Sequence, residues 1–77
     1  MIFLIEYDRS RGEIISLENF DDKDWQRAEE TCFEKELSLN HAGIEHEVVL
    51  LEAVSEEALR RTHRRYFENI EQLSTMP

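Results

Sequence analysis

Four of the nine basic residues of this chain fall within six positions, in the run 60–65, although the formal net charge is −9. Guanidinium groups clustered in this way can bind the phosphates of nucleic acid or the carboxylates of an acidic protein. On a helix these arginines would lie opposite Leu59 and Tyr66, which places them in solvent. The residues of this candidate partner-binding surface are Arg60, Arg61, Arg64 and Arg65.

Carboxylates at helical spacing accompany these arginines. Glu56 and Glu57 each precede an arginine by four residues, and Glu68 follows two others by three and four residues. Such pairs each stabilise a helix by about 0.2–0.5 kcal/mol. The pattern therefore favours a solvated, salt-bridged helix face and does not favour a nucleic-acid site. An acidic protein partner stays open, since residues 1–54 contain 14 acidic and 5 basic residues, a net charge of −9.

Two carboxylates, Glu29 and Glu36, lie seven residues apart in the apolar sector of a predicted helix. Such a pair can act as general acid and base or supply half of a metal site, and His63 could join it. The simpler interpretation is that both glutamates reach solvent or pair with arginine. We favour it because nothing in the sequence fixes a third ligand. We therefore predict no catalytic residue, no metal and no cofactor, and enzymatic activity is not favoured.

Hydrophobic patterning and turn signals predict the element order β-β-α-β-α. Strands are expected at 2–7, 13–19 and 46–53, where β-branched and aromatic residues gather. Asp21 is expected to cap a helix that ends at about Ala42, with Gly43 in the left-handed conformation and Ile44 folding back onto Leu39. Ser55 is expected to cap a second helix that continues to about Gln72.

These elements predict a single α+β domain over residues 1–73 and a frayed tail at 74–77. A hairpin joins the first two strands, and a crossover through the first helix carries the third strand to the free side of the first. The expected fold is a two-layer, split β-α-β (half-ferredoxin-like) unit. Its three-stranded antiparallel sheet has the order 2-1-3, with both helices on one face.

That arrangement leaves one apolar sheet face uncovered, which indicates an interface. The residues expected there are Ile2, Leu4, Val48 and Leu50. The alternative is a partly exposed sheet shielded by long side chains such as Arg9 and Arg11. A core of this size without a disulfide is often completed by a second copy. The sequence therefore predicts a homodimer formed through the sheet.

The apolar run at 1–5 is too short for a signal-peptide core or a membrane span, and Cys32 has no partner cysteine. We therefore expect a cytoplasmic protein that does not associate with membranes. The best functional hypothesis is a small protein-interaction or regulatory module. The alternatives are a nucleic-acid-associated protein that uses the arginines, and a minimal ligand-binding domain or enzyme around Glu29, Glu36 and His63.

Overall fold

A three-stranded antiparallel sheet forms the centre of the structure, a computed structural model that describes residues 1–67. Its strands are β1 (Ile2–Asp8), β2 (Glu13–Phe20) and β3 (Glu47–Glu52), in the order β2-β1-β3. The predicted α+β class and strand order are therefore confirmed. The predictions for 68–77, which include the frayed tail, lie outside the described residues.

The hairpin between β1 and β2 contains a β-bulge. Glu6 pairs with Ser16 but Tyr7 pairs with Ile14, so Ile15 is an extra residue on β2. A bulge bends its strand and interrupts the ladder. The outer strand β2 is therefore irregular near its start.

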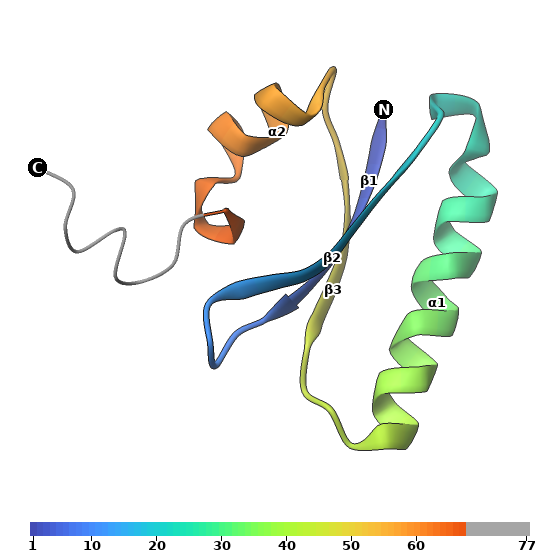
Figure 1. Ribbon diagram of the computed structural model, residues 1–77. Helices are drawn as coiled ribbons and strands as arrows, with labels where there is room; N and C mark the ends of the chain where they lie inside the picture. Colours follow the sequence, from blue (N-terminus) through green and yellow to red (C-terminus); the bar gives the residue numbers. More distant parts are fainter. Residues whose placement is uncertain (68–77) are drawn as a thin grey trace, which may run out of the picture.

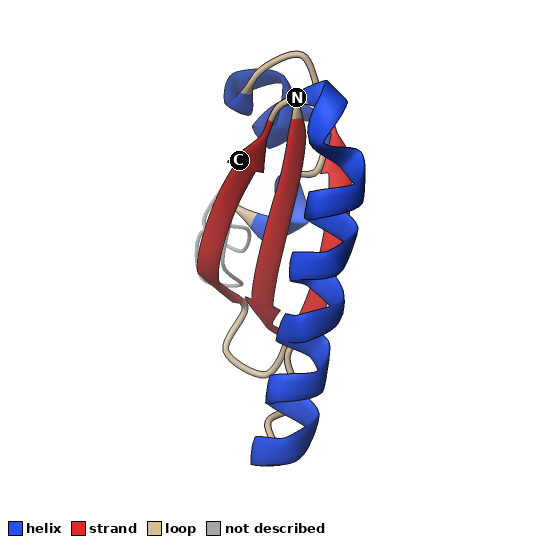
Figure 2. Ribbon diagram, turned by 90° about the vertical axis from the view of Figure 1, so that its right-hand side faces the viewer, coloured by secondary structure: helices blue, strands red, loops and turns tan. Residues whose placement is uncertain are grey.

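The two helices cover opposite faces of the sheet, so the prediction of two layers with both helices on one face is wrong. Figure 1 shows the sheet between α1 (Trp25–Ala42) on one side and α2 (Glu56–Thr62) on the other. α1 contacts β3 and β1, and Figure 2 shows it lying over one side of the sheet and running roughly along the strands. The physical reason is that β1 is apolar on both faces, and each face excludes water only when an element covers it.

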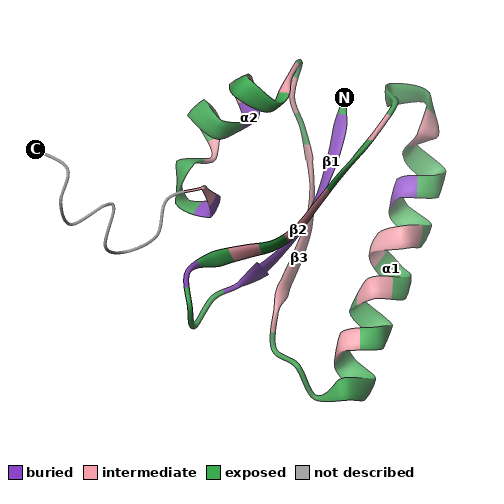
Figure 3. Ribbon diagram, viewed as in Figure 1, coloured by how far each residue is buried: buried purple, intermediate pink, exposed green. Residues whose placement is uncertain are grey.

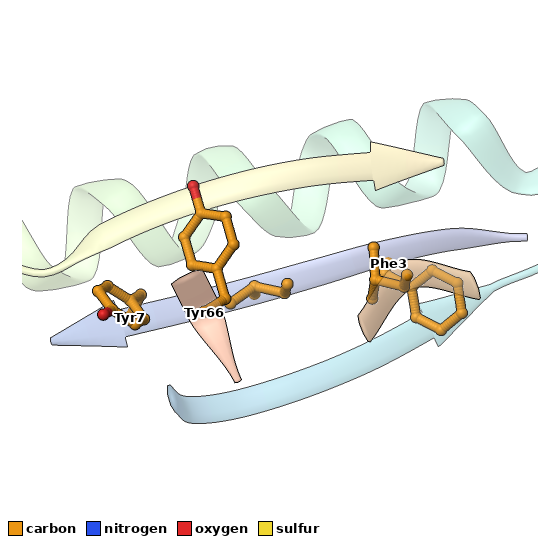
Figure 4. Packing of buried hydrophobic residues seen from close by; sticks show 5 residues of the cluster. Phe3, Tyr7 and Tyr66 are labelled. Carbon is orange, nitrogen blue, oxygen red and sulfur yellow. The ribbon is translucent and has the colours of Figure 1, made fainter. Parts of the chain in front are cut away.

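The main core lies on the sheet face that α2 covers. It contains the buried side chains of alternate β1 residues, Leu59 from α2 and Tyr66 from the 3-10 turn η2 (Arg64–Tyr66). Figure 4 shows Tyr66 beside Tyr7, with Phe3 further along the same strand. The buried members of this core are Phe3, Ile5, Tyr7, Leu59 and Tyr66.

The other sheet face lies under α1. Because side chains alternate along a strand, Ile2 and Leu4 point away from the main core, and they are 1% and 0% exposed. The uncovered face on which the predicted dimer interface depended is therefore absent from residues 1–67. Val48 and Leu50, the other two residues of that interface, are half-buried on the same face. The side of α1 that points away from the sheet is exposed in Figure 3, and Phe33 is 61% exposed.

The start of the first helix differs from the prediction, whereas its end agrees. A 3-10 turn, η1 (Asp22–Asp24), precedes α1, and the Asp21 side chain makes no capping hydrogen bond. At the other end Gly43 has φ +69°, and the Ile44 amide donates to the Leu39 carbonyl at 2.9 Å. This is the predicted Schellman ending.

The second helix is shorter than predicted. Ser55 Oγ accepts the Ala58 amide at 3.1 Å, which confirms the cap. The helix ends at Thr62 and does not continue to about Gln72, because His63 leaves the helical region at φ −126° and ψ 52°. The chain then turns through η2, which brings Tyr66 onto the sheet. Core packing therefore overrides helix propensity after Thr62.

Candidate functional site: the free edge of β3

The arginines of the predicted partner-binding surface are all exposed. Arg60 and Arg61 lie 3.3 Å from Glu56 and Glu57, which are the intrahelical pairs that the spacing predicts. The Arg60 guanidinium also stacks on the Phe67 ring at 4.6 Å. The carboxylates of the same helix therefore offset the charges of Arg60 and Arg61.

Arg65 makes a contact that sequence spacing did not predict. Its guanidinium lies 3.3 Å from Glu47 of β3 and stacks over the ring of Tyr66 at 4.2 Å. Its predicted partner Glu68 lies outside the described residues. Arg65 thus connects η2 to the sheet, which gives this residue a structural role.

The sheet separates the three residues of the predicted acid–base site. Glu29 and Glu36 belong to α1, whereas His63 follows α2 on the opposite face. His63 Nδ1 lies 2.9 Å from the Thr62 hydroxyl. Side chains on opposite faces of a sheet cannot share a cleft, so the hypothesis built on these three residues loses its geometric basis.

Cys32 lies on the sheet side of α1 and is half-buried. Burial raises the pKa of its thiol, and the carboxylate of Glu36 raises it further. The thiol donates a hydrogen bond to this carboxylate, with Sγ 3.6 Å from Oε1. A thiol that stays protonated is a poor nucleophile. Cys32 therefore does not resemble a catalytic cysteine.

A buried charged cluster lies at the far end of β1, on the α1 face. Glu6 and Asp8 are 9% and 8% exposed. His46 lies between them, with Nδ1 2.6 Å from Glu6 and Nε2 3.6 Å from Asp8, and Lys35 Nζ lies 3.7 Å from Glu6. Hydrogen bonds from Ser10 and Arg11, of which the Ser10 hydroxyl has the largest effect, hold the pKa of Asp8 below its usual value. His46 and Lys35 therefore give the two buried carboxylates polar partners at this end of the sheet.

Two kinds of site have no support in the part of the chain that the structure describes. No three His, Cys, Asp or Glu side chains there are placed to hold a metal ion together. None of the helices there has the length and apolar character to cross a membrane.

The outer edge of β3 carries backbone groups that the sheet leaves unused. Among residues 1–67, β3 pairs with β1 alone. The Ala53 amide donates to the Met1 carbonyl at 3.1 Å, which fixes the alternation of the antiparallel ladder. It follows that Phe3↔Leu51 and Ile5↔Val49 are hydrogen-bonded pairs and that the pairs between them are not. The residues whose N–H and C=O groups point to the free edge are Val48, Leu50 and Glu52.

The sequence of β3 does nothing to block this edge. Natural edge strands usually carry a bulge, a proline or a central charge that prevents pairing with another strand. The stretch 48–51 is Val-Val-Leu-Leu, with glutamates only at the two ends of the strand. The opposite edge differs, because β2 contains the bulge at Ile15 and an exposed Glu18. β3 is therefore the edge that is open to another strand.

A hollow lies where this edge meets the C-terminal half of α1. Its apolar lining comes from Leu39, Ile44 and Val48, and Ile44 is 43% exposed. Two carboxylates also line it, and no lysine or arginine does. The residues that line it are Glu36, Leu39, Asn40, Ile44, Glu45, His46 and Val48.

No protein family, no curated protein and no solved structure matches this chain.

The open edge of β3 could have been predicted from the sequence. The predicted order 2-1-3 already places the third strand at an edge, and its uncharged centre can be read directly from residues 48–51. The hollow could not have been predicted, because residues of both α1 and β3 line it and their proximity depends on which sheet face α1 covers.

Proposed function

We propose that this chain is a small protein-interaction module that binds an extended segment of another protein along the free edge of β3. The observation that supports the proposal is the row of outward backbone groups at Val48, Leu50 and Glu52, on a strand without blocking residues. An added strand would hydrogen-bond to these groups, and its side chains would alternate between the two sheet faces.

The same edge could also pair with β3 of a second copy. The homodimer would then form through the edge of the sheet and not through the sheet face that the sequence predicted. Antiparallel pairing about a two-fold axis would place both copies of α1 on one face. α1 lies over β3 and β1, so the two helix axes would come within about 10 Å of each other, from a strand spacing of about 4.8 Å. Helices at that distance are in direct contact.

Charge argues against this contact between copies. The side of α1 nearest the free edge carries Glu36, which lines the hollow beside Val48. Glu29 lies two turns earlier on the same side. Each copy would therefore present these carboxylates to the other, and like charges across an interface cost several kcal/mol. A strand from another protein carries no second α1 and avoids this repulsion.

Backbone amide exchange, measured by NMR, tests the proposal. In the free protein the Val48 and Leu50 amides should exchange quickly, while those of Val49 and Leu51 exchange slowly. The probe is a short synthetic peptide of alternating threonine and valine. Binding along the edge should protect Val48 and Leu50 and leave Val49 and Leu51 nearly unchanged.

Two sets of controls separate strand addition from other modes of binding. Leu50→Pro removes an edge N–H and should abolish binding, whereas Leu50→Ala shortens the side chain, keeps the N–H and should still bind. N-methylation of alternate peptide residues leaves the protein unaltered. It should block binding when the methylated residues are those whose N–H groups face β3, and it should not block binding when they are the residues in between. Perturbations confined to the outer side of α1 would overturn the proposal.

A further inference from the structure

We propose that the strand recognised by β3 carries a lysine or arginine opposite Val48, and that the hollow beside α1 receives this side chain. The inference rests on the proposed strand addition and specifies the chemistry of the partner.

The ladder fixes which partner residue enters the hollow. Val48 offers both its N–H and its C=O to the free edge, so the residue opposite would form a hydrogen-bonded pair with it. Side chains of directly opposed residues point to the same sheet face. Val48 lies on the α1 face and lines the hollow, so the opposed side chain would enter there.

The lining of the hollow suits a long side chain with an apolar stem and a positive head. Leu39, Ile44 and Val48 offer apolar surface to the stem. Glu36 and Glu45 also line the hollow and are exposed, so a charged group beside them would remain partly solvated. Lysine and arginine combine these properties, because their methylene stems pack on apolar surface while the head stays near water.

The basic side chains near the hollow already contact carboxylates of this chain. The two ring nitrogens of His46 face Glu6 and Asp8, at 2.6 and 3.6 Å. Lys35 contacts Glu6 at 3.7 Å and Glu18 at 3.5 Å.

The chain itself does not supply the expected basic strand. Residues 68–77 contain neither lysine nor arginine. β3 of a second copy is flanked by Glu47 and Glu52. Charge complementarity therefore points to a basic segment of another protein.

The test compares three peptides that differ only at the central residue of the alternating threonine–valine probe. That residue is lysine, norleucine, which has a similar stem without the charge, or glutamate. Binding is followed by the NMR shifts of the Val48 and Leu50 amides at low and high salt. We expect the lysine peptide to bind about threefold to tenfold more tightly than the norleucine peptide at low salt. The glutamate peptide should bind most weakly, and high salt should reduce these differences.

Matched variants assign the effect to the hollow. The double variant Glu36→Gln/Glu45→Gln should remove the advantage of lysine over norleucine and leave the binding of norleucine unchanged. Glu34→Gln, an exposed substitution on the same helix, should leave the advantage intact. An advantage that survives the double variant would overturn the inference.

The outcomes for this inference and for the proposed function can be distinguished. Equal binding of lysine and norleucine at the edge would overturn the basic preference and leave strand addition standing. Failure of all three peptides to protect Val48 and Leu50 would overturn both proposals. Sedimentation that shows a dimer, together with protected Val48 and Leu50 amides in the free protein, would instead identify a second copy as the occupant.

Discussion

Tyr66 meets Tyr7 edge to face, with ring centroids 5.0 Å apart and ring planes at 89°. The Tyr7 hydroxyl also donates to the Arg65 carbonyl at 3.1 Å. These contacts fasten η2 to the central strand immediately after α2 ends. Edge-to-face aromatic pairs contribute about 0.5–1.5 kcal/mol beyond the area that they bury.

Replacing Tyr66 by alanine should lower the free energy of unfolding by about 3–5 kcal/mol, because it removes a buried aromatic ring from a small core. Urea titration followed by circular dichroism measures the change. Arg61→Ala, on the exposed side of α2, should change stability by less than about 0.5 kcal/mol. A Tyr66→Ala variant as stable as Arg61→Ala would show that η2 does not close the core.

Gly43 holds the C-terminus of α1 in a left-handed conformation, with φ +69°. Gly43→Ala should destabilise the protein by about 1 kcal/mol, since a Cβ disfavours this conformation. No atom lies within 4 Å of the position that the Cβ would take, so no clash should add to this cost. Gly43→Asn should cost less than Gly43→Ala in the same urea titration. The reverse order would contradict the assignment.

The lowered pKa of Asp8 makes stability depend on acidity. The folded protein holds this carboxylate ionised at a pH where the unfolded chain is already protonated. Its contribution is therefore present above the usual pKa and is lost as the pH falls through the lowered pKa of the folded state. Carboxyl NMR titration should show Asp8 titrating below its usual value of 3.8.

Ser10→Ala checks the cause of that shift, because the Ser10 hydroxyl donates to Asp8 at 2.8 Å. The substitution should move the pKa of Asp8 upward, toward its usual value, while Ser38→Ala on the exposed side of α1 should not. An unchanged Asp8 titration in Ser10→Ala would rule out this hydroxyl as the main cause.

Cys32 should react slowly with iodoacetamide at neutral pH, because burial and Glu36 both raise the pKa of its thiol. Glu36→Gln removes the negative charge and should increase the rate, whereas Glu34→Gln should leave it unchanged. The measurement is the alkylation rate against pH, followed by mass spectrometry. Equal rates in the two variants would show that Glu36 does not control the thiol.

The elements and their ends were largely predictable, because each depends on residues that are close together in the sequence. Alternation of apolar residues and the turn at Gly12 define the hairpin, Ser55 caps α2, and Gly43 ends α1. The side of the sheet that each helix covers was not predictable in the same way. It depends on β1 being apolar on both faces, a fact that fits either a bare face with a partner or a second covering helix.

The contacts of the candidate site residues show the same difference between local and long-range causes. The arginine pairs within α2 follow from spacing alone, as Arg61 and Glu57 show. The contact between Arg65 and Glu47 depends on the break at His63, which core packing imposes. The sequence pattern suggested that Glu36 could act with His63, but in the structure Glu36 lines the hollow beside Val48.

The position of β1 has a consequence for how the protein is made. Every residue from Ile2 to Asp8 is buried, and Ile2 pairs with Glu52 near the far end of the described chain. During synthesis β1 leaves the ribosome before β3 and α2 exist, so the side chains on its α2 face cannot yet be covered. The strand that is best protected in the finished protein is therefore exposed during part of its synthesis, when aggregation is the competing outcome.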